Sequence, residues 1–382
     1  MIPSTGTPVT IPDILQATFT SSDFEAEMRR LLGVKHVLTA NSGTTSFYVI
    51  LLALKRFLGG DEIIMPAYTA PSLVLPIKKA GLNYRLVDVS LETFNMDLSK
   101  ALDAVTDKTM AMLCIHMFGL PLLIDKLREQ TDVFMIEDAA SSFGTSKDGK
   151  LSGAFGDAGF ISFNRGKNLS TVAGGVVVTD RDELAEAVRQ EIGKLPEADV
   201  KTRLMIYAKA LGLSYAIRPW FYTLFSAVLS RFKYTTVHEG FSSFRYTDFQ
   251  RSLGSVMLRK SDLIFQARAQ KGRLLHNAFR DMKGIRIPLL SEGWRSVFNQ
   301  FPLIIEDKTR RLKVMEAIRA VGLESTILYD SPIHAIYPEP GGHYPNAEYM
   351  AERLVLVPVQ HYVTDDKLYQ AVEAIAGAVQ LR

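Results

Sequence analysis

Short apolar runs alternate with helical stretches through the first half of the chain. Apolar residues recur at helical spacing from Phe47 to Leu58, and Gly59-Gly60 is expected to end that helix. A further helix is expected from Asp180 to Val188. This alternation predicts an α/β fold with a mostly parallel seven-stranded sheet and helices on both faces. The expected strands are His36–Leu38, Glu62–Met65, Tyr84–Val87, Met110–Ile115, Val133–Ile136, Ala158–Ser162 and Gly175–Thr179.

The pattern changes from about Tyr246 onward, where long helices replace the regular alternation. The last helix is expected to begin near Thr364, a suitable N-cap, with Asp365 and Asp366 in its first turn. We therefore predict a large α/β domain over residues 1–240 and a smaller C-terminal α+β domain over 241–382. The other expected elements are one or two helices within Phe249–Phe279, a strand at Ser296–Ile305, a helix at Lys308–Val321 and a strand at Leu354–Val357.

An apolar insertion, about 200–235, separates the two expected domains. Its core, Leu204 to Phe232, is rich in Leu, Phe, Tyr, Trp and Ala, and is interrupted by Lys209, Arg218 and Pro219. Each apolar piece is shorter than the ~20 residues of a membrane-spanning helix. We expect a helical hairpin packed on the protein or at an oligomer interface. The alternative is a peripheral contact of residues 204–232 with a membrane surface.

Composition excludes several classes of protein. The formal net charge is only +3, from 44 basic and 41 acidic residues, so nothing indicates a nucleic-acid partner. The single cysteine, Cys114, can form neither an intramolecular disulfide nor a thiolate metal site, and we expect no bound metal. The first residues lack a basic stretch followed by an apolar one, which favours a cytoplasmic location.

Three chemistry-bearing groups follow strands of the expected sheet. Asn41 to Thr45 joins a strand to a helix, Asp138 follows another strand, and Lys167 lies in a loop after a third. In parallel sheets such groups meet at the carboxyl edge. Gly43, Thr44 and Thr45 would present free amides at a helix start, a ready site for a phosphate. A lysine, an acid and a phosphate turn are what pyridoxal phosphate (PLP) requires.

The lysine and the acid have distinct expected roles. The amine of Lys167 would attack the PLP aldehyde and then move protons on the substrate. A carboxylate would face the pyridine nitrogen and keep it protonated. Glu137 competes with Asp138 for this role, and only one of the two can face the ring, because neighbours on a strand point to opposite faces. Ser162 offers a hydroxyl to the phosphate.

Three further residues are weaker candidates for substrate contacts. His116 ends an apolar strand and would either touch the cofactor or substrate or be a satisfied core histidine. His334 would either contact substrate or be an ordinary loop histidine. Arg165 would pair with a substrate anion or with solvent. The sequence has no phosphate-binding P-loop, no dinucleotide-binding glycine fingerprint and no metalloprotease motif.

Several motifs follow one another in a fixed order along nearly the whole chain. They are Asn41–Thr45, Ile64–Thr69, Val87–Val89 with Asn95–Asp97, Ile115–Gly119, Glu137–Gly144, Ser162–Lys167, Arg245–Gln250 with Leu253-Gly254, and Leu328–His334. As an ordered set they resemble the nucleotide-sugar aminotransferases of the DegT/DnrJ/StrS family, which belong to the fold-type I PLP enzymes.

The resemblance implies roles for individual residues. Lys167 would bind PLP covalently and Asp138, rather than Glu137, would partner the pyridinium nitrogen. It also implies a homodimer with shared active sites, and transfer of an amino group, usually from glutamate, to a keto sugar linked to a nucleotide, for polysaccharide or glycoconjugate biosynthesis. The cofactor-binding set would be Gly43, Thr44, Thr45, Tyr68, Asp138, Ser141, Ser162, Lys167 and Ser243.

The chain departs from the family pattern at four places. Ala70 occupies the position of an aromatic residue that stacks on the PLP ring, so the stack is either missing or supplied by another residue such as Tyr68 or His116. Ser141 replaces a common Gln or His, and Ser243 replaces an Asn that reaches the partner subunit's phosphate. The usual Gly-Glu-Gly-Gly after the lysine reads Val-Ala-Gly-Gly at 172–175.

These departures leave two alternatives to a sugar aminotransferase. One is another PLP reaction on the same scaffold, such as sugar deoxygenation, although related dehydratases have a histidine in place of the lysine. The other is a diverged PLP-fold protein without transaminase activity.

Overall fold

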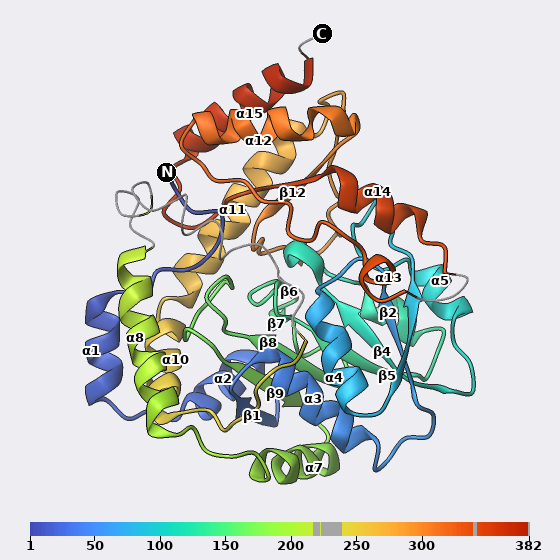
Figure 1. Cartoon of the computed structure of the whole chain (residues 1–382), viewed down its shortest axis with the longest axis vertical. Helices are drawn as coiled ribbons and strands as arrows, with labels where there is room; N and C mark the ends of the chain where they lie inside the picture. Colours follow the sequence, from blue (N-terminus) through green and yellow to red (C-terminus); the bar gives the residue numbers. More distant parts are fainter. Residues whose placement is uncertain (217–221, 223–238, 339–341, 381–382) are drawn as a thin grey trace.

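The computed structural model describes residues 1–216, 222, 239–338 and 342–380 (Figure 1). Its main sheet has the strand order β1-β9-β8-β5-β4-β2-β3. Adjacent strands from β8 to β3 run parallel, while β9 is antiparallel to both of its neighbours, so the predicted mostly parallel seven-stranded sheet is confirmed. The strands are β1 (His36–Ala40), β2 (Glu62–Pro66), β3 (Asn83–Val87), β4 (Thr109–Ile115), β5 (Phe134–Asp138), β8 (Ala158–Ser162) and β9 (Gly175–Thr179).

Helices cover both faces of this sheet because its strands are apolar on both sides. On β1, Leu38 packs toward one face and Val37 toward the other. The first face is covered by α3 (Gly43–Leu54), α4 (Val74–Lys79) and α7 (Asp182–Gly193). The second face is covered by α2 (Phe24–Leu32) and α11 (Ser261–Phe279) over β1, β9 and β8, and by α5 (Leu98–Asp103) and α6 (Ile124–Arg128) over β4 and its neighbours.

The C-terminal part contains a second, antiparallel sheet and its own helices. Strand β12 (Phe301–Ile305) lies between β10 (Ile285–Arg286) and β13 (Leu354–Val357). Helices α12 (Arg311–Ala320) and α15 (Asp365–Gln380) pack against each other beside this sheet. Helix α15 buries Leu368, Ile375 and Val379 on its inner side. The remaining elements are α10 (Asp248–Leu258), α13 (Ile333–Ile336), α14 (Pro345–Arg353), β6 (Ser146–Lys147), β7 (Lys150–Leu151), β11 (Trp294–Arg295), η1 (Pro71–Leu73), η2 (Met117–Gly119) and η3 (Lys308–Arg310).

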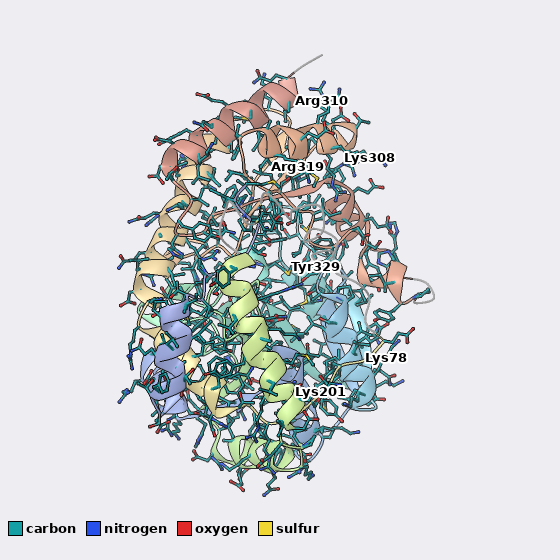
Figure 2. The ribbon with its side chains drawn as sticks, turned by 60° about the vertical axis from the view of Figure 1, so that its left-hand side comes forward. Lys78, Lys201, Lys308, Arg310, Arg319 and Tyr329 are labelled. Atoms are coloured by element: carbon teal, nitrogen blue, oxygen red, sulfur yellow. The ribbon has the colours of Figure 1, made fainter. Side chains whose placement is uncertain are left out.

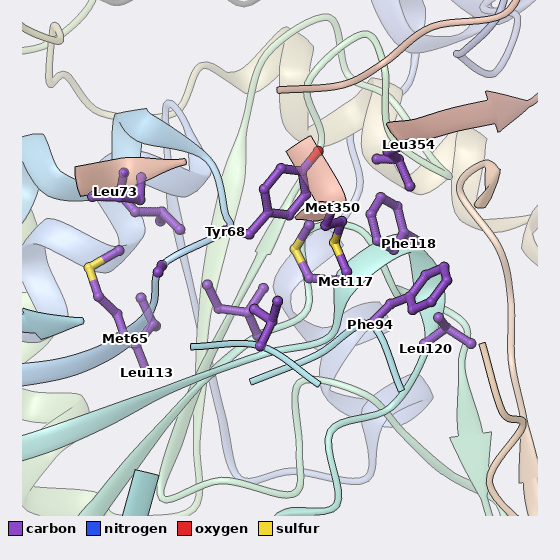
Figure 3. Close-up of a cluster of buried hydrophobic side chains, with 14 of the residues drawn as sticks. Met65, Tyr68, Leu73, Phe94, Leu113, Met117, Phe118, Leu120, Met350 and Leu354 are labelled. Atoms are coloured by element: carbon purple, nitrogen blue, oxygen red, sulfur yellow. The ribbon is translucent and has the colours of Figure 1, made fainter. Parts of the chain in front are cut away.

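One apolar core joins the two parts. Figure 3 shows Met350 and Leu354 of the C-terminal part close to Tyr68, Phe94 and Phe118 from loops of the main sheet. At the other end of the chain, Ile2 exchanges backbone hydrogen bonds with residues 322 and 324. The boundary at 240/241 therefore stays a prediction.

Three predicted element bounds were wrong. Helix α3 ends at Leu54 instead of Leu58, because the amides of Arg56 and Phe57 bond three residues back in a tighter turn. Helix α7 begins two residues later than predicted and runs on to Gly193. Residues 296–300 form no strand, because their amides bond to loops of the main sheet: Val297 N donates to Thr145 Oγ1 and Asn299 N donates to the carbonyl of residue 118.

The first arm of the apolar insertion is helix α8 (Val200–Ala216), which packs against α1 (Ile11–Phe19) and, through Tyr207 on Phe249, against α10. The second arm of the predicted hairpin, 217–232, lies outside the described residues except for Tyr222. Of the helices in the described ranges, none has both the length and the apolar character needed to cross a bilayer.

Candidate active site

The residues that the sequence predicts to carry the chemistry lie together at the carboxyl edge of the main sheet. Asp138 ends β5 and pairs in register with Ile115, the end of β4, and with Phe160 on β8. Ser162 ends β8 and pairs with Gly175, the start of β9. The loop that follows Ser162 carries Lys167. The acid, the serine and the lysine therefore lie at neighbouring strand ends.

Lys167 has a partly buried side chain whose amine donates a hydrogen bond to Ser141 Oγ over 3.0 Å. Burial lowers the pKa of this amine, and the carboxylate of Asp138 offsets part of that effect. A lysine with a lowered pKa is neutral, and hence nucleophilic, at a lower pH than an ordinary lysine. The geometry suits covalent capture of an aldehyde.

Asp138 is buried opposite this amine. Its Oδ1 accepts a hydrogen bond from the amide of Ala140 at 2.8 Å. Burial raises the pKa of its carboxyl group, and the attraction of Lys167 opposes that rise. The pKa of the nearby Tyr329 phenol is raised mainly by its own burial and further by the negative charge of Asp138. Asp138 is thus placed to hold a positive charge beside Lys167.

Glu137 points to the opposite face of β5 and serves the fold. Its Oε1 accepts from Gly153 N at 2.5 Å, and its Oε2 accepts from Phe155 N at 2.7 Å and Gly156 N at 3.0 Å. Burial alone would raise its pKa, but hydrogen bonds from His116 and from these amides bring the pKa below its usual value. With every acceptor position occupied by the protein, Glu137 is unsuited to face a cofactor.

His116 is fully buried, and both of its ring nitrogens are engaged by the protein. Its Nδ1 accepts from Leu122 N at 2.8 Å, which makes Nε2 the donor to Glu137 Oε1 at 2.7 Å. The ring is therefore neutral and fixed in one tautomer. Of the two readings of His116, this arrangement favours the satisfied core histidine over a residue that stacks on the cofactor.

The turn before α3 has the geometry of a phosphate cradle. Ser42 caps the helix, with its Oγ accepting from Thr45 N at 3.0 Å. A methyl group added at Gly43 would lie 2.9 Å from Ser162 Cβ, so this turn rests directly on the end of β8. The first amides of α3 have no carbonyl within the helix to bond. They and the Ser162 hydroxyl can bind a phosphate dianion.

Ser243 lies at the same turn of its own chain. Its Oγ is 3.5 Å from Thr45 Oγ1, and Asn41 Nδ2 donates to the neighbouring Ser242 carbonyl at 2.9 Å. The resemblance implied contact with the phosphate of a partner subunit. Ser243 therefore lies beside Thr45 at the start of α3 of its own chain, and its contact with a partner's phosphate stays a prediction.

Tyr68 is fully buried, and its hydroxyl donates to the carbonyl of Tyr329 at 3.1 Å. The two rings meet edge to face with centroids 5.7 Å apart. Leu328 has a left-handed backbone (φ 60°), a conformation that leucine rarely adopts. Tyr68 therefore supports a strained turn that presents Tyr329 near Asp138. Tyr329 lies inside a motif that the sequence flagged, but nothing in its spacing singled it out.

The remaining substrate candidates lie at the edge of this group. Arg165 is exposed in the lysine loop. His334 Nε2 is 3.0 Å from Glu348 Oε1, so a surface acid already engages it. The amide of Ile333 donates to Ala67 O at 2.8 Å, which ties helix α13 to the loop after β2.

A buried hydrogen-bond network adjoins the loop of Lys167, and it could not be recognised from the sequence. Thr7 Oγ1 donates to the carbonyl of Asn168 at 2.5 Å, and Asn168 Nδ2 donates to Phe143 O at 2.9 Å, which joins the lysine loop to the loop after Asp138. Arg268, fully buried on α11, reaches Thr7 Oγ1 with one guanidinium nitrogen at 3.4 Å. No local pattern links residues so far apart in the chain.

A known protein family and several known proteins resemble this chain over most of its length. The model of the DegT/DnrJ/EryC1/StrS aminotransferase family matches residues 14–376. The spore coat polysaccharide biosynthesis protein SpsC of Bacillus subtilis is 27% identical over 370 residues, covering 94% of this chain and 89% of that protein.

Two solved structures have the same fold. The sugar aminotransferase CalS13 of Micromonospora echinospora superimposes with a TM-score of 0.77 at 20% identity, covering 99% of this chain and 100% of that one. The E. coli GDP-4-keto-6-deoxy-D-mannose-3-dehydratase with bound hydrated PLP gives 0.75 at 20% identity, covering 98% and 99%.

Proposed function

This chain belongs to the DegT/DnrJ/EryC1/StrS aminotransferase family, and we propose that it is a PLP-dependent aminotransferase that moves an amino group from glutamate to a keto sugar linked to a nucleotide. The observation that carries the proposal is the placement of Asp138 at the end of β5 and of Lys167 in the loop after the neighbouring β8, near enough for the charge of each group to shift the pKa of the other. The proposal includes a role in polysaccharide or glycoconjugate biosynthesis, a homodimer and a cytoplasmic location, which the sequence led us to expect.

The residues of the site fit PLP. The start of α3 and the hydroxyls of Thr45 and Ser162 would hold its phosphate, and Asp138 would face its ring nitrogen. When bound, PLP supplies an electron sink for the substrate carbon that loses a proton. The crowding of Gly43 against Ser162 supports this assignment, because only a glycine leaves the helix start open at that point.

The chain's own contribution to the reaction centres on one proton. The Nζ of Lys167, whose lowered pKa favours the neutral amine, would accept a proton from the substrate carbon and return it. Ser141 Oγ would orient this amine through the 3.0 Å hydrogen bond. Tyr329, held near Asp138 by Tyr68, would line the same site.

Sugar deoxygenation is the competing reaction within the family, since the E. coli structure compared above is a dehydratase. Related dehydratases have a histidine where this chain has Lys167. A lysine amine can bind PLP covalently and shuttle the proton, whereas histidine performs only the second task. The presence of Lys167 therefore supports amino transfer.

Product analysis tests the proposal. The purified protein, PLP and nitrogen-15 glutamate are incubated with a panel of nucleotide-linked keto sugars and analysed by mass spectrometry. We expect a product in which the keto oxygen is replaced by a labelled amine, with 2-oxoglutarate formed in equal amount. A keto sugar that has lost one hydroxyl oxygen and carries no label would instead establish deoxygenation.

A further inference from the structure

Helices α1 and α8 lie side by side on the surface (Figure 1). Both carry apolar side chains that are exposed. On α8, Val200 is 74%, Leu204 is 66% and Leu211 is 43% exposed. On α1, Leu15 is 53% and Phe19 is 82% exposed. We call these five residues, with the exposed Ala208, the α1–α8 face. A packed surface helix ordinarily presents polar residues on its outer side.

The exposed apolar residues lie on both helices beside the contact between them. Val200, Leu204 and Leu211 recur at helical spacing and fall on one side of α8, while Ile206 and Ala210 on the other side are buried. The hydroxyls of Tyr207 and Thr18 meet at the seam. Leu15 is three residues before Thr18 and Phe19 is next to it, so both helices expose their apolar rows beside the same contact.

The charged residues of α8 all have one sign. Helix α8 contains three basic residues, Lys201, Arg203 and Lys209, which we call the basic stretch, and no acidic residue. The whole chain carries a net charge of only +3. Figure 2 shows α8 at the front of the molecule, with Lys201 near its start.

The acids nearest in sequence do not cancel this charge on the face. Asp199 caps the start of α8 by accepting from Thr202 N at 2.7 Å, and Glu197 pairs with Arg203 and Arg245. On α1, Asp13 is buried and pairs with Lys260. The exposed Lys201 and Lys209 therefore flank an apolar stripe with no acid on α8 itself.

We propose that the α1–α8 face docks the enzyme on an anionic phospholipid surface. An apolar row with lysines along its flank is the pattern of a helix that lies in the plane of a membrane interface. Anionic headgroups complement the basic stretch, and each lysine near such a surface adds to the attraction. A second copy of the chain fits less well, because a two-fold interface would set this basic stretch against itself. This inference is independent of the substrate.

Vesicle co-sedimentation of the PLP-loaded full chain tests the proposal. We expect binding to vesicles of equal parts phosphatidylcholine and phosphatidylglycerol, with much weaker binding to phosphatidylcholine alone and in high salt. The double variant Leu204→Glu/Leu211→Glu should lower the partition at least about tenfold. The charge reversal Lys201→Glu/Lys209→Glu should lower binding to the mixed vesicles by about tenfold or more.

A matched control separates this face from general surface effects. Leu263→Glu on α11 changes a leucine that is 62% exposed and should leave vesicle binding unchanged. All variants should keep the wild-type PLP absorbance, since none alters the site. The proposal is overturned if the wild type binds neither vesicle type. It is also overturned if Leu263→Glu loses as much binding as Leu204→Glu/Leu211→Glu. It is also overturned if the double variant binds vesicles normally but sediments as a smaller oligomer, which would make the face a contact between copies.

Discussion

The amine of Lys167 lies 3.0 Å from the hydroxyl of Ser141. This contact spans the two loops that follow β8 and β5, so it fixes the lysine over the strand end that carries Asp138. Asn168 reinforces the same junction through its hydrogen bond to Phe143 O. These contacts between the two loops set the relative position of the lysine and the acid, and this arrangement leads to the following predictions.

Replacing Asp138 by Asn should move the titration of Lys167 to lower pH. The Asp138 carboxylate raises the pKa of the lysine amine, against the larger lowering caused by burial. Without that negative charge the protonated amine is less stable, so its pKa falls further. Acetylation of the apoprotein with acetic anhydride across a pH series, with exposed Lys126 as internal reference, measures this pKa. An unchanged or higher midpoint would show that the two groups do not interact.

The two adjacent acids should differ sharply in their effect on stability. Glu137→Gln places an amide N–H₂ group against backbone donors that now point at a carboxylate, and we expect the free energy of unfolding to fall by about 3 kcal/mol. Asp138→Asn should cost no more than about 1 kcal/mol, because the folded protein already disfavours the Asp138 charge. Urea denaturation measures both, and equal losses would contradict the assigned faces of β5.

Gly43→Ala should weaken PLP binding about tenfold, roughly 1.4 kcal/mol. The added methyl group would lie 2.9 Å from Ser162 Cβ and push the start of α3 away from the end of β8. The double variant Gly43→Ala/Ser162→Gly should recover part of the loss, because the clashing atoms are gone. A methyl group added at Gly59 would meet no atom within 4 Å, so Gly59→Ala is the matched control. Fluorescence titration with PLP gives the affinities, and equal affinity of Gly43→Ala and wild type would refute the cradle.

Arg268→Met should lower the free energy of unfolding by about 3 kcal/mol or more. The guanidinium group donates to the carbonyls of Phe298 at 3.2 Å and Asn299 at 2.8 Å, and these buried acceptors would lose their partner. Arg280→Met, on an exposed residue of the same region, should change stability by less than about 0.5 kcal/mol. Urea denaturation of the two variants makes the comparison, and similar values for both would contradict the structural role of Arg268.

The sequence predicted well whatever depends on local pattern. All seven strands of the main sheet appear within a few residues of their expected bounds, because buried parallel strands are short apolar runs between turns. The alternation of side chains on a strand correctly required Glu137 and Asp138 to face opposite ways, and the structure supplies the partners that distinguish them.

Features that depend on distant contacts could not be predicted. Val297 and Phe298 resemble the apolar residues of a strand, yet the amides of Val297 and Asn299 bond to Thr145 and to the loop at residue 118. Arg268 supports the lysine loop through Thr7, which lies at the other end of the chain. Tyr329 is placed by a strained Leu328 and by Tyr68, and a backbone strain of that kind leaves no pattern in composition or spacing.

Borohydride reduction of the PLP-loaded protein tests the central claim most directly. We expect the characteristic absorbance of lysine-bound PLP before reduction, and a single modified peptide containing Lys167 after proteolysis and mass spectrometry. Lys167→Ala should show neither. A modified lysine elsewhere, or a wild-type protein that binds PLP without any covalent attachment, would contradict the account.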